Sequence, residues 1–170
     1  MRQDCHSDLD RRINEAISRH LPSNSASLSL ADAAALAQYA HEAALEHAVP
    51  VVFSLVDAGG QQRYFFSMDN ALLVSQSLAG KKAWSAAALR MPTHQLATAI
   101  QPGASLYGLQ HEPGICCLGG GLPCWSGGVL LGAIGISGGS VEQDIAIASA
   151  ALARFSRERF PLTAVNASIS

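Results

Sequence analysis

Residues 119–144 read GGGLPCWSGGVLLGAIGISGGSVEQD, a glycine-dense stretch that contains an apolar run from Val129 to Ile136. Glycine has no Cβ, so it tolerates tight turns and the close approach of other backbone. The stretch therefore predicts short strands joined by glycine turns, at Ile115–Leu118, Leu122–Ser126 and Val129–Ile136. A capping box at Ser140-x-x-Gln143 then predicts a last helix that ends near Phe160.

The sequence before this stretch alternates between helical and strand patterns. Ser29-x-x-Asp32 starts an alanine-rich helix to about His47, and two β-rich runs around Asp57–Gly60 predict a hairpin. A helix over residues 70–89, capped by Asp69 or Asn70, counts Leu72 and Leu73 among its apolar positions, and a shorter helix covers 93–100. Residues 103–114 show no periodicity, which is typical of a functional or interfacial loop.

Strands joined by short turns must run antiparallel, so this order predicts an α+β fold with one five-stranded antiparallel sheet flanked by helices. A parallel nucleotide-binding sheet does not fit it. Ser7-x-x-Asp10 starts an additional amphipathic helix that Pro22 ends. We therefore expect an N-terminal helix and linker over 1–27, a single domain over 28–160 and a flexible tail over 161–170.

Composition narrows the class of protein. Only 14% of the 170 residues are charged, which predicts that self-association into a homo-oligomer buries part of the surface. The net charge of −2 offers no basic footprint for nucleic acid. The apolar runs are too short to span a membrane, and the start of the chain has no signal-peptide core, so we expect a cytoplasmic protein.

No nucleotide-binding or nucleophile motif accompanies the glycines, and we assign no catalytic residue. Turn formation and packing explain Gly119, Gly120 and Gly121, although their backbone amides could also cradle an anion or the edge of a ligand. His41 and His47 lie six residues apart, about 120° around a helix, so they cannot share a metal ion. They are either surface histidines or, singly, ligands of a planar cofactor.

A structural role can explain the positions of several other polar residues as well as a functional one can. They are the cysteines, two carboxylates and one lysine. Cys116, Cys117 and Cys124 lack zinc-site spacing and are expected to pack as small apolar residues. Turn and helix-start positions make Asp69 and Asp144 candidate caps. Lys82, on an alanine-rich helical face, either reaches solvent or pairs with a carboxylate such as Asp69.

Taken together, several motifs resemble those of the GlcG/HbpS family. The resemblance covers about residues 28–152, in the family's order and spacing, and rests on the segments 56–60, 67–71, 82–87, 119–123, and 132–139 with 142–144. Within that family, the chain is similar to the C-terminal domain of PduO-type adenosyltransferases and to OrfY-type proteins of glycerol and diol dehydratase loci. The ATP-binding adenosyltransferase domain has no counterpart here, so adenosyl transfer is not implied.

The resemblance implies a profilin-like α/β/α domain that forms homo-oligomers and binds haem or accompanies cobalamin metabolism. It makes haem the candidate cofactor, with His41 and His47 as candidate iron ligands. The remaining candidate ligand-binding residues are Met68, Asp69, Lys82, Gly119, Gly120, Gly121 and Asp144. We expect a non-enzymatic ligand-binding protein; the alternatives are an accessory protein of cobalamin-dependent glycerol or propanediol metabolism without its own cofactor, and a haem-degrading enzyme.

Overall fold

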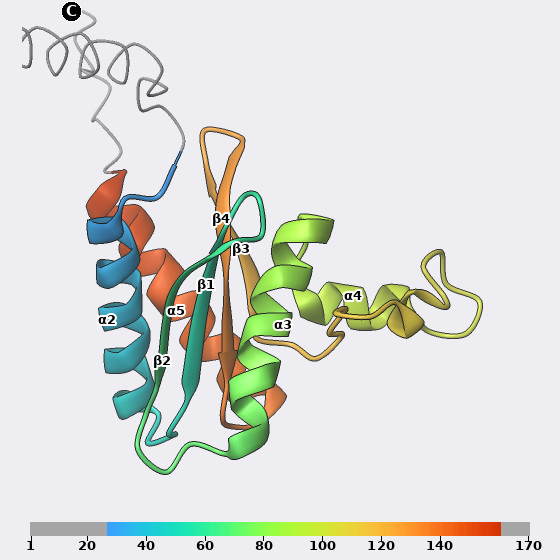
Figure 1. The fold of residues 1–170 in the computed structure, drawn as a ribbon, viewed down its shortest axis with the longest axis horizontal. Coiled ribbons are helices and arrows are strands. Elements are labelled where there is room, and N and C mark those ends of the chain that lie inside the picture. The colour runs from blue at the N-terminus through green and yellow to red at the C-terminus, as the bar shows by residue number, and fades with distance from the viewer. Residues whose placement is uncertain (1–26, 161–170) are drawn as a thin grey trace, which may run out of the picture.

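The computed structural model describes residues 27–160, which form three layers (Figure 1). The elements run in the order α2 (Leu30–Glu46), β1 (Val52–Asp57), β2 (Gln62–Ser67), α3 (Leu73–Leu89), α4 (Thr93–Ala99), the 3₁₀ turn η1 (Leu109–His111), β3 (Gly121–Ser126), β4 (Val129–Ser137) and α5 (Val141–Arg159). Helices α2 and α5 pack together on one face of the sheet, and α3 covers the other. The α+β class with helices on both faces is confirmed; the helix expected before residue 27 and the tail after 160 lie outside the described residues.

The sheet has four antiparallel strands in the order β2-β1-β4-β3, so the expectation of a fifth was wrong. The missing strand is Ile115–Leu118. There the backbone N–H of Cys116 donates to Ser85 Oγ on α3 at 2.8 Å, which directs the segment along the helix instead of into the sheet. The glycines that follow return the chain to the sheet, where Gly120 O accepts a hydrogen bond from Ile136 N at 2.9 Å.

Helices α2, α4 and α5 start where the sequence predicts, and α3 does not. Capping boxes at Ser29 and Ser140 begin α2 and α5. Helix α3 begins later than expected, with Leu72 as an N-cap that makes no side-chain hydrogen bond. The cause is Asn70, whose φ of 64° turns the chain before the helix can start.

The main core lies between the sheet and the pair α2 and α5, and it includes Leu36, Phe53, Ile134, Ile147 and Phe155. On the other face α3 approaches β4 closely, because a Cβ on Gly135 would collide with the carbonyl oxygen of Ala79. The glycines of β4 thus allow an alanine-rich helix to lie almost directly on the strand.

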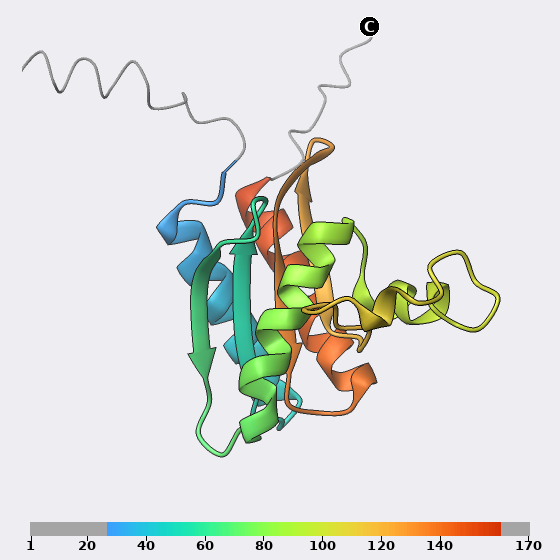
Figure 2. The same ribbon diagram turned by 45° about the vertical axis from the view of Figure 1, so that its right-hand side comes forward.

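Residues 100–118, with α4 before them, extend sideways from the three-layer body (Figure 2). This arm contains η1 and the residues for which the sequence shows no periodicity. Within the described residues, no helix combines the length and the apolar character needed to cross a bilayer.

Candidate ligand-binding site between α2 and β2

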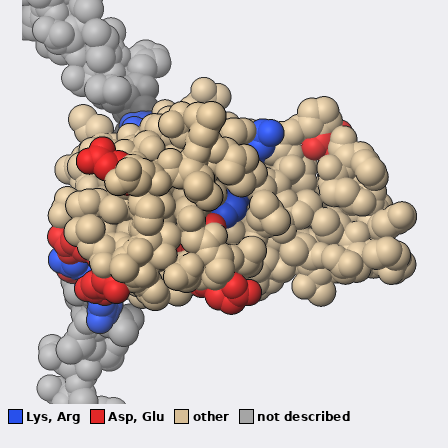
Figure 3. Space-filling model, turned by 90° about the horizontal axis from the view of Figure 1, so that it is seen from below, with Lys and Arg blue, Asp and Glu red and all other residues tan. Residues whose placement is uncertain are grey.

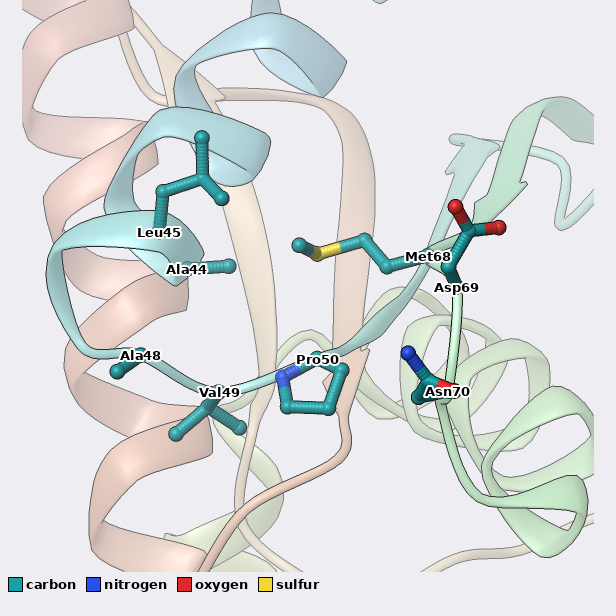
Figure 4. Close-up of a pocket in the computed structure, with 8 residues that line it drawn as sticks. All are labelled: Ala44, Leu45, Ala48, Val49, Pro50, Met68, Asp69 and Asn70. Carbon is teal, nitrogen blue, oxygen red and sulfur yellow. The ribbon is translucent and has the colours of Figure 1, made fainter.

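A pocket of about 280 Å³ opens where α2 ends and β2 leads toward α3 (Figure 4). Its lining comes from the last turn of α2, the link to β1 and the segment after β2. The lining residues are Ala44, Leu45, Ala48, Val49, Pro50, Met68, Asp69 and Asn70. The lining is mainly apolar, as expected for a site that takes a largely apolar ligand.

One face of α2 supplies both the helical wall of the pocket and a histidine. Ala44 and Leu45 follow His41 by three and four residues within α2, a spacing that places all three on the same side of the helix. Ala48 lies beyond the end of the helix, where its φ of 52° turns the chain toward β1. His41 therefore lies one turn from the pocket on the helix face that lines it. His47, the C-cap of α2, is exposed and lies about 120° away around the helix.

The segment after β2 supplies the opposite wall, and Phe66 near the end of β2 contacts α2 next to it. The ring of Phe66 meets the imidazole of His41 edge-on, with centroids 6.0 Å apart, and stacks on Phe53 at 5.3 Å. Met68 follows two residues later, and its side chain points toward Ala44 and Leu45 (Figure 4). The sulfur of Met68 also accepts a hydrogen bond from Val51 N at 3.4 Å, which fixes the thioether over the pocket. The imidazole of His41 thus contacts the ring of Phe66 next to the pocket, while the thioether of Met68 lies in the pocket lining itself.

Asp69 contributes to the rim rather than to the interior of the pocket, because its carboxylate points away from Ala44 and Leu45 (Figure 4). Of the candidate ligand-binding residues predicted from the sequence, Met68 and Asp69 thus line this pocket. The other lining residues were not predicted. The helical spacing of apolar positions after His41 could have revealed Ala44 and Leu45, but not the residues beyond the end of α2.

The other predicted candidates gather on the far side of the sheet, around a buried ion pair. Lys82 is 2% exposed; its Nζ donates to Asp144 Oδ2 at 2.7 Å and to Ile136 O at 2.8 Å. Asp144 Oδ1 accepts from Gly139 N at 3.0 Å. The partner of Lys82 is therefore Asp144 and not Asp69, because the lysine side chain is directed inward toward the first turn of α5.

Gly119, Gly120 and Gly121 pack tightly around this ion pair. A Cβ on Gly120, whose φ is 108°, would lie 2.6 Å from Ile136 O and 2.9 Å from the Cβ of Asp144. All three glycines are buried. The arrangement joins α3, α5 and the ends of β3 and β4, and its observed contacts are those of a packed structural junction.

The cysteines of the described residues are free thiols. Cys116 and Cys124 are buried, and burial raises the pKa of the Cys124 thiol to about 11. A thiol held in its neutral form is a poor nucleophile and metal ligand. Between residues 27 and 160, no group of three or more His, Cys, Asp or Glu side chains is arranged to hold a metal ion.

Residues 28–153 match the family model described as haem degrading protein HbpS-like. The chain belongs to the HbpS-like family. It is also 52% identical over 129 residues to the corrinoid adenosyltransferase PduO of Citrobacter freundii, an alignment that covers 75% of this chain but only 38% of PduO.

Several solved structures are similar to this HbpS-like chain in both sequence and fold. A crystal structure of a PduOC:haem complex is 48% identical, with a TM-score of 0.72, and the match covers 75% of this chain and 94% of that one. The Klebsiella pneumoniae protein ORFY is 43% identical, with a TM-score of 0.74, and the match covers 79% and 95% of the two chains. The resemblance predicted from the sequence motifs is confirmed.

Proposed function

We propose that this HbpS-like chain is a haem-binding protein that takes haem at the pocket between α2 and β2, with the imidazole of His41 as an iron ligand. The proposal rests mainly on one observation: a relative that is 48% identical over 75% of this chain has been crystallised as a PduOC:haem complex. The proposal also takes this protein to be a homo-oligomer and a binding protein without catalytic activity.

The residues of the pocket fit such a ligand. Its apolar lining suits the faces of a porphyrin, and the Met68 thioether lies over it. A neutral imidazole is a common axial ligand of haem iron, and His41 lies half-buried on the helix face that leads into the pocket. Bound haem would supply an iron centre whose absorption spectrum reports its ligands.

Titration with haemin tests the proposal, and the chain provides a matched control. The wild type should bind haemin stoichiometrically with a shifted Soret band. His41→Ala should lose that shift, whereas His47→Ala, on the same helix but facing away from the pocket, should retain it. Unaltered binding by His41→Ala would overturn the assignment of the ligand, and no binding by the wild type at low micromolar haemin would overturn the function.

A second candidate is an accessory role in cobalamin-dependent glycerol or propanediol metabolism without a cofactor of its own. It is supported by the 52% identity to part of a corrinoid adenosyltransferase. Co-purification of the tagged chain with a diol or glycerol dehydratase, or with its reactivating protein, should then occur whether or not haemin is present. Normal growth of a deletion strain on glycerol and propanediol would contradict this role.

A further inference from the structure

Three apolar side chains face solvent at the end of the domain where α2 starts. Leu30 is 70% exposed, Val129 48% and Phe160 38%. Leu30 opens α2, Val129 opens β4 and Phe160 follows α5, and these three element ends lie at the same end of the molecule (Figure 1). We call Leu30, Val129 and Phe160 the α2-start patch. The candidate haem pocket lies at the other end of α2.

The α2-start patch lies on a fixed framework. In the first turn of α2, Asp32 Oδ1 accepts a hydrogen bond from Arg159 Nε at 2.8 Å, which joins the start of α2 to the end of α5. The ring of Phe160 meets the ring of Phe155 edge-on, with centroids 6.2 Å apart, and Phe155 belongs to the main core. The patch is therefore positioned from below, while residues 27–160 leave its outer side uncovered.

The N-terminal part of the chain joins the domain at this same point. Leu28 and Ala33 both belong to the main core and are 3% and 1% exposed. They occupy the position before the capping Ser29 and the fourth position of the helix, a pair that forms a hydrophobic staple and fixes the direction in which the chain enters. The linker of residues 22–27, fully extended, spans at most about 20 Å. Residues 7–21 therefore stay near the patch.

The sequence of residues 7–21 provides an apolar stripe that needs a surface. Its apolar positions recur at helical spacing and are Leu9, Ile13, Ala16 and Ile17. A helix of about 15 residues is marginal alone in water and gains most of its stability by packing an apolar face. The family model begins at residue 28, so this segment lies outside the part of the chain that matches the family.

A segment of the same chain suits the α2-start patch better than a free partner does. A stable complex between separate proteins buries about 800 Å² on each partner, through roughly 20–30 residues a side, and three exposed side chains are few for such a contact. A tethered segment is present at an effective concentration in the millimolar range, so a small apolar contact is enough. Residues 161–170 leave from the same end, but most of them are small or polar and they are too few for a stable helix.

We propose that residues 7–21 form a helix whose apolar stripe docks on the α2-start patch of the same chain. The docked helix covers Leu30 and Phe160 and completes this end of the domain. It leaves the pocket at the other end of α2 open, so the interaction does not depend on haem.

Amide hydrogen exchange of the full chain tests the docking from both sides of the contact. Exchange at residues 9–17 should be slow in the wild type, and Ile13→Glu should speed it about tenfold or more, because a charge interrupts the apolar stripe. Leu30→Glu and Val129→Lys should speed the same amides without any change in the segment itself.

Two substitutions are matched controls and should leave this exchange unchanged. Ser18→Glu adds a charge on the side of the predicted helix opposite Leu9 and Ile13. Leu73→Glu adds one at the other end of the molecule, where Leu73 is 81% exposed in the first turn of α3. Figure 3 views that end directly and shows a mostly uncharged surface.

Fast exchange at residues 9–17 in the wild type would overturn the docking. So would slow exchange that survives both Leu30→Glu and Val129→Lys while the amides of α5 stay protected. Protection that is lost on about a hundredfold dilution would assign the segment to the patch of a second copy, and protection that is lost on deletion of residues 162–170 would make the tail the occupant; either result contradicts the proposal. Haemin binding should be the same in Leu30→Glu and the wild type, so the exchange measurement decides the docking even if the proposed function fails.

Discussion

Replacing Lys82 with methionine should destabilise the protein by about 3–5 kcal/mol, because it removes one partner of a buried ion pair. Lys82 Nζ donates to Asp144 and to the carbonyl of Ile136, at 2.7 and 2.8 Å, and both charged side chains are under 5% exposed. Methionine has a similar length and no charge. The variant would leave the Asp144 carboxylate buried without its cation. Of the hydrogen bonds that the described residues make to this carboxylate, only the one donated by Gly139 N, at 3.0 Å, would remain.

The double variant Lys82→Met/Asp144→Asn separates the cost of the unpaired charge from the cost of lost packing. Asparagine keeps an oxygen for the Gly139 N–H and buries no charge, so the double variant should be more stable than Lys82→Met alone. Equilibrium unfolding in urea gives both free energies, and the coupling between neighbouring residues should reach about 1–3 kcal/mol. A cost below about 1 kcal/mol for Lys82→Met, or additive single effects, would refute this account of the junction. The double variant should bind haemin with the same affinity as the wild type. A loss of affinity would instead show that Lys82 and Asp144 belong to the ligand-binding site.

Four further substitutions test the rest of the scaffold. Gly120→Ala should lower the free energy of unfolding by about 1–3 kcal/mol, because Gly120 has a left-handed φ and a Cβ there would crowd Ile136 O. Gly80→Ala should raise it by about 0.5–1 kcal/mol, because Gly80 lies within a helix and a Cβ there has open space. Urea unfolding measures both changes. Cys124, whose thiol has its pKa raised by burial from 9.0 to about 11, keeps its proton in the folded state while the unfolded chain loses it. Stability should therefore fall between pH 9 and 11 by about 2–3 kcal/mol more in the wild type than in Cys124→Ala, and parallel pH profiles would contradict this. Ser140→Ala removes the hydroxyl that accepts a hydrogen bond from Gln143 N and should cost about 1 kcal/mol, with thermal unfolding as the measurement.

Local patterns were enough to predict most of the secondary structure. The capping boxes at Ser29 and Ser140 set the starts of two helices, and the turn at Asp57–Gly60 closes the hairpin, because these features depend on neighbours within a few residues. Two predictions were wrong, one because of a contact with a distant residue and one because of a local backbone conformation. Ile115–Leu118 resembles a strand, but Ser85 on α3 takes the backbone N–H of Cys116, and Asn70 enters the left-handed region and delays α3.

The candidate site was only partly predictable for the same reason. The sequence indicates His41 and Met68 separately, whereas their placement on one side of the molecule depends on α2 packing against the edge strand β2. The partner of Lys82 could not be read from the sequence, since Asp144 is 62 residues away. The exposure of Leu73 was missed because helical spacing identifies an apolar side chain without saying what it will contact.

The junction around Lys82 and the ligand pocket are built largely from different segments of the chain. Gly120 and Asp144 belong to the junction around Lys82, which fixes α3 and α5 against the sheet. The pocket is built mainly from the end of α2 and the segment after β2, although Val49 and Pro50 in its lining pack against Gly139 and Gly138, next to the junction. Substitutions on α2 can therefore change what is bound while the motifs that identify the family stay intact. Under the proposed function, haem binding by this chain should therefore depend on His41 and on the apolar residues Ala44 and Leu45 that follow it, and not on Gly119, Gly120 and Gly121.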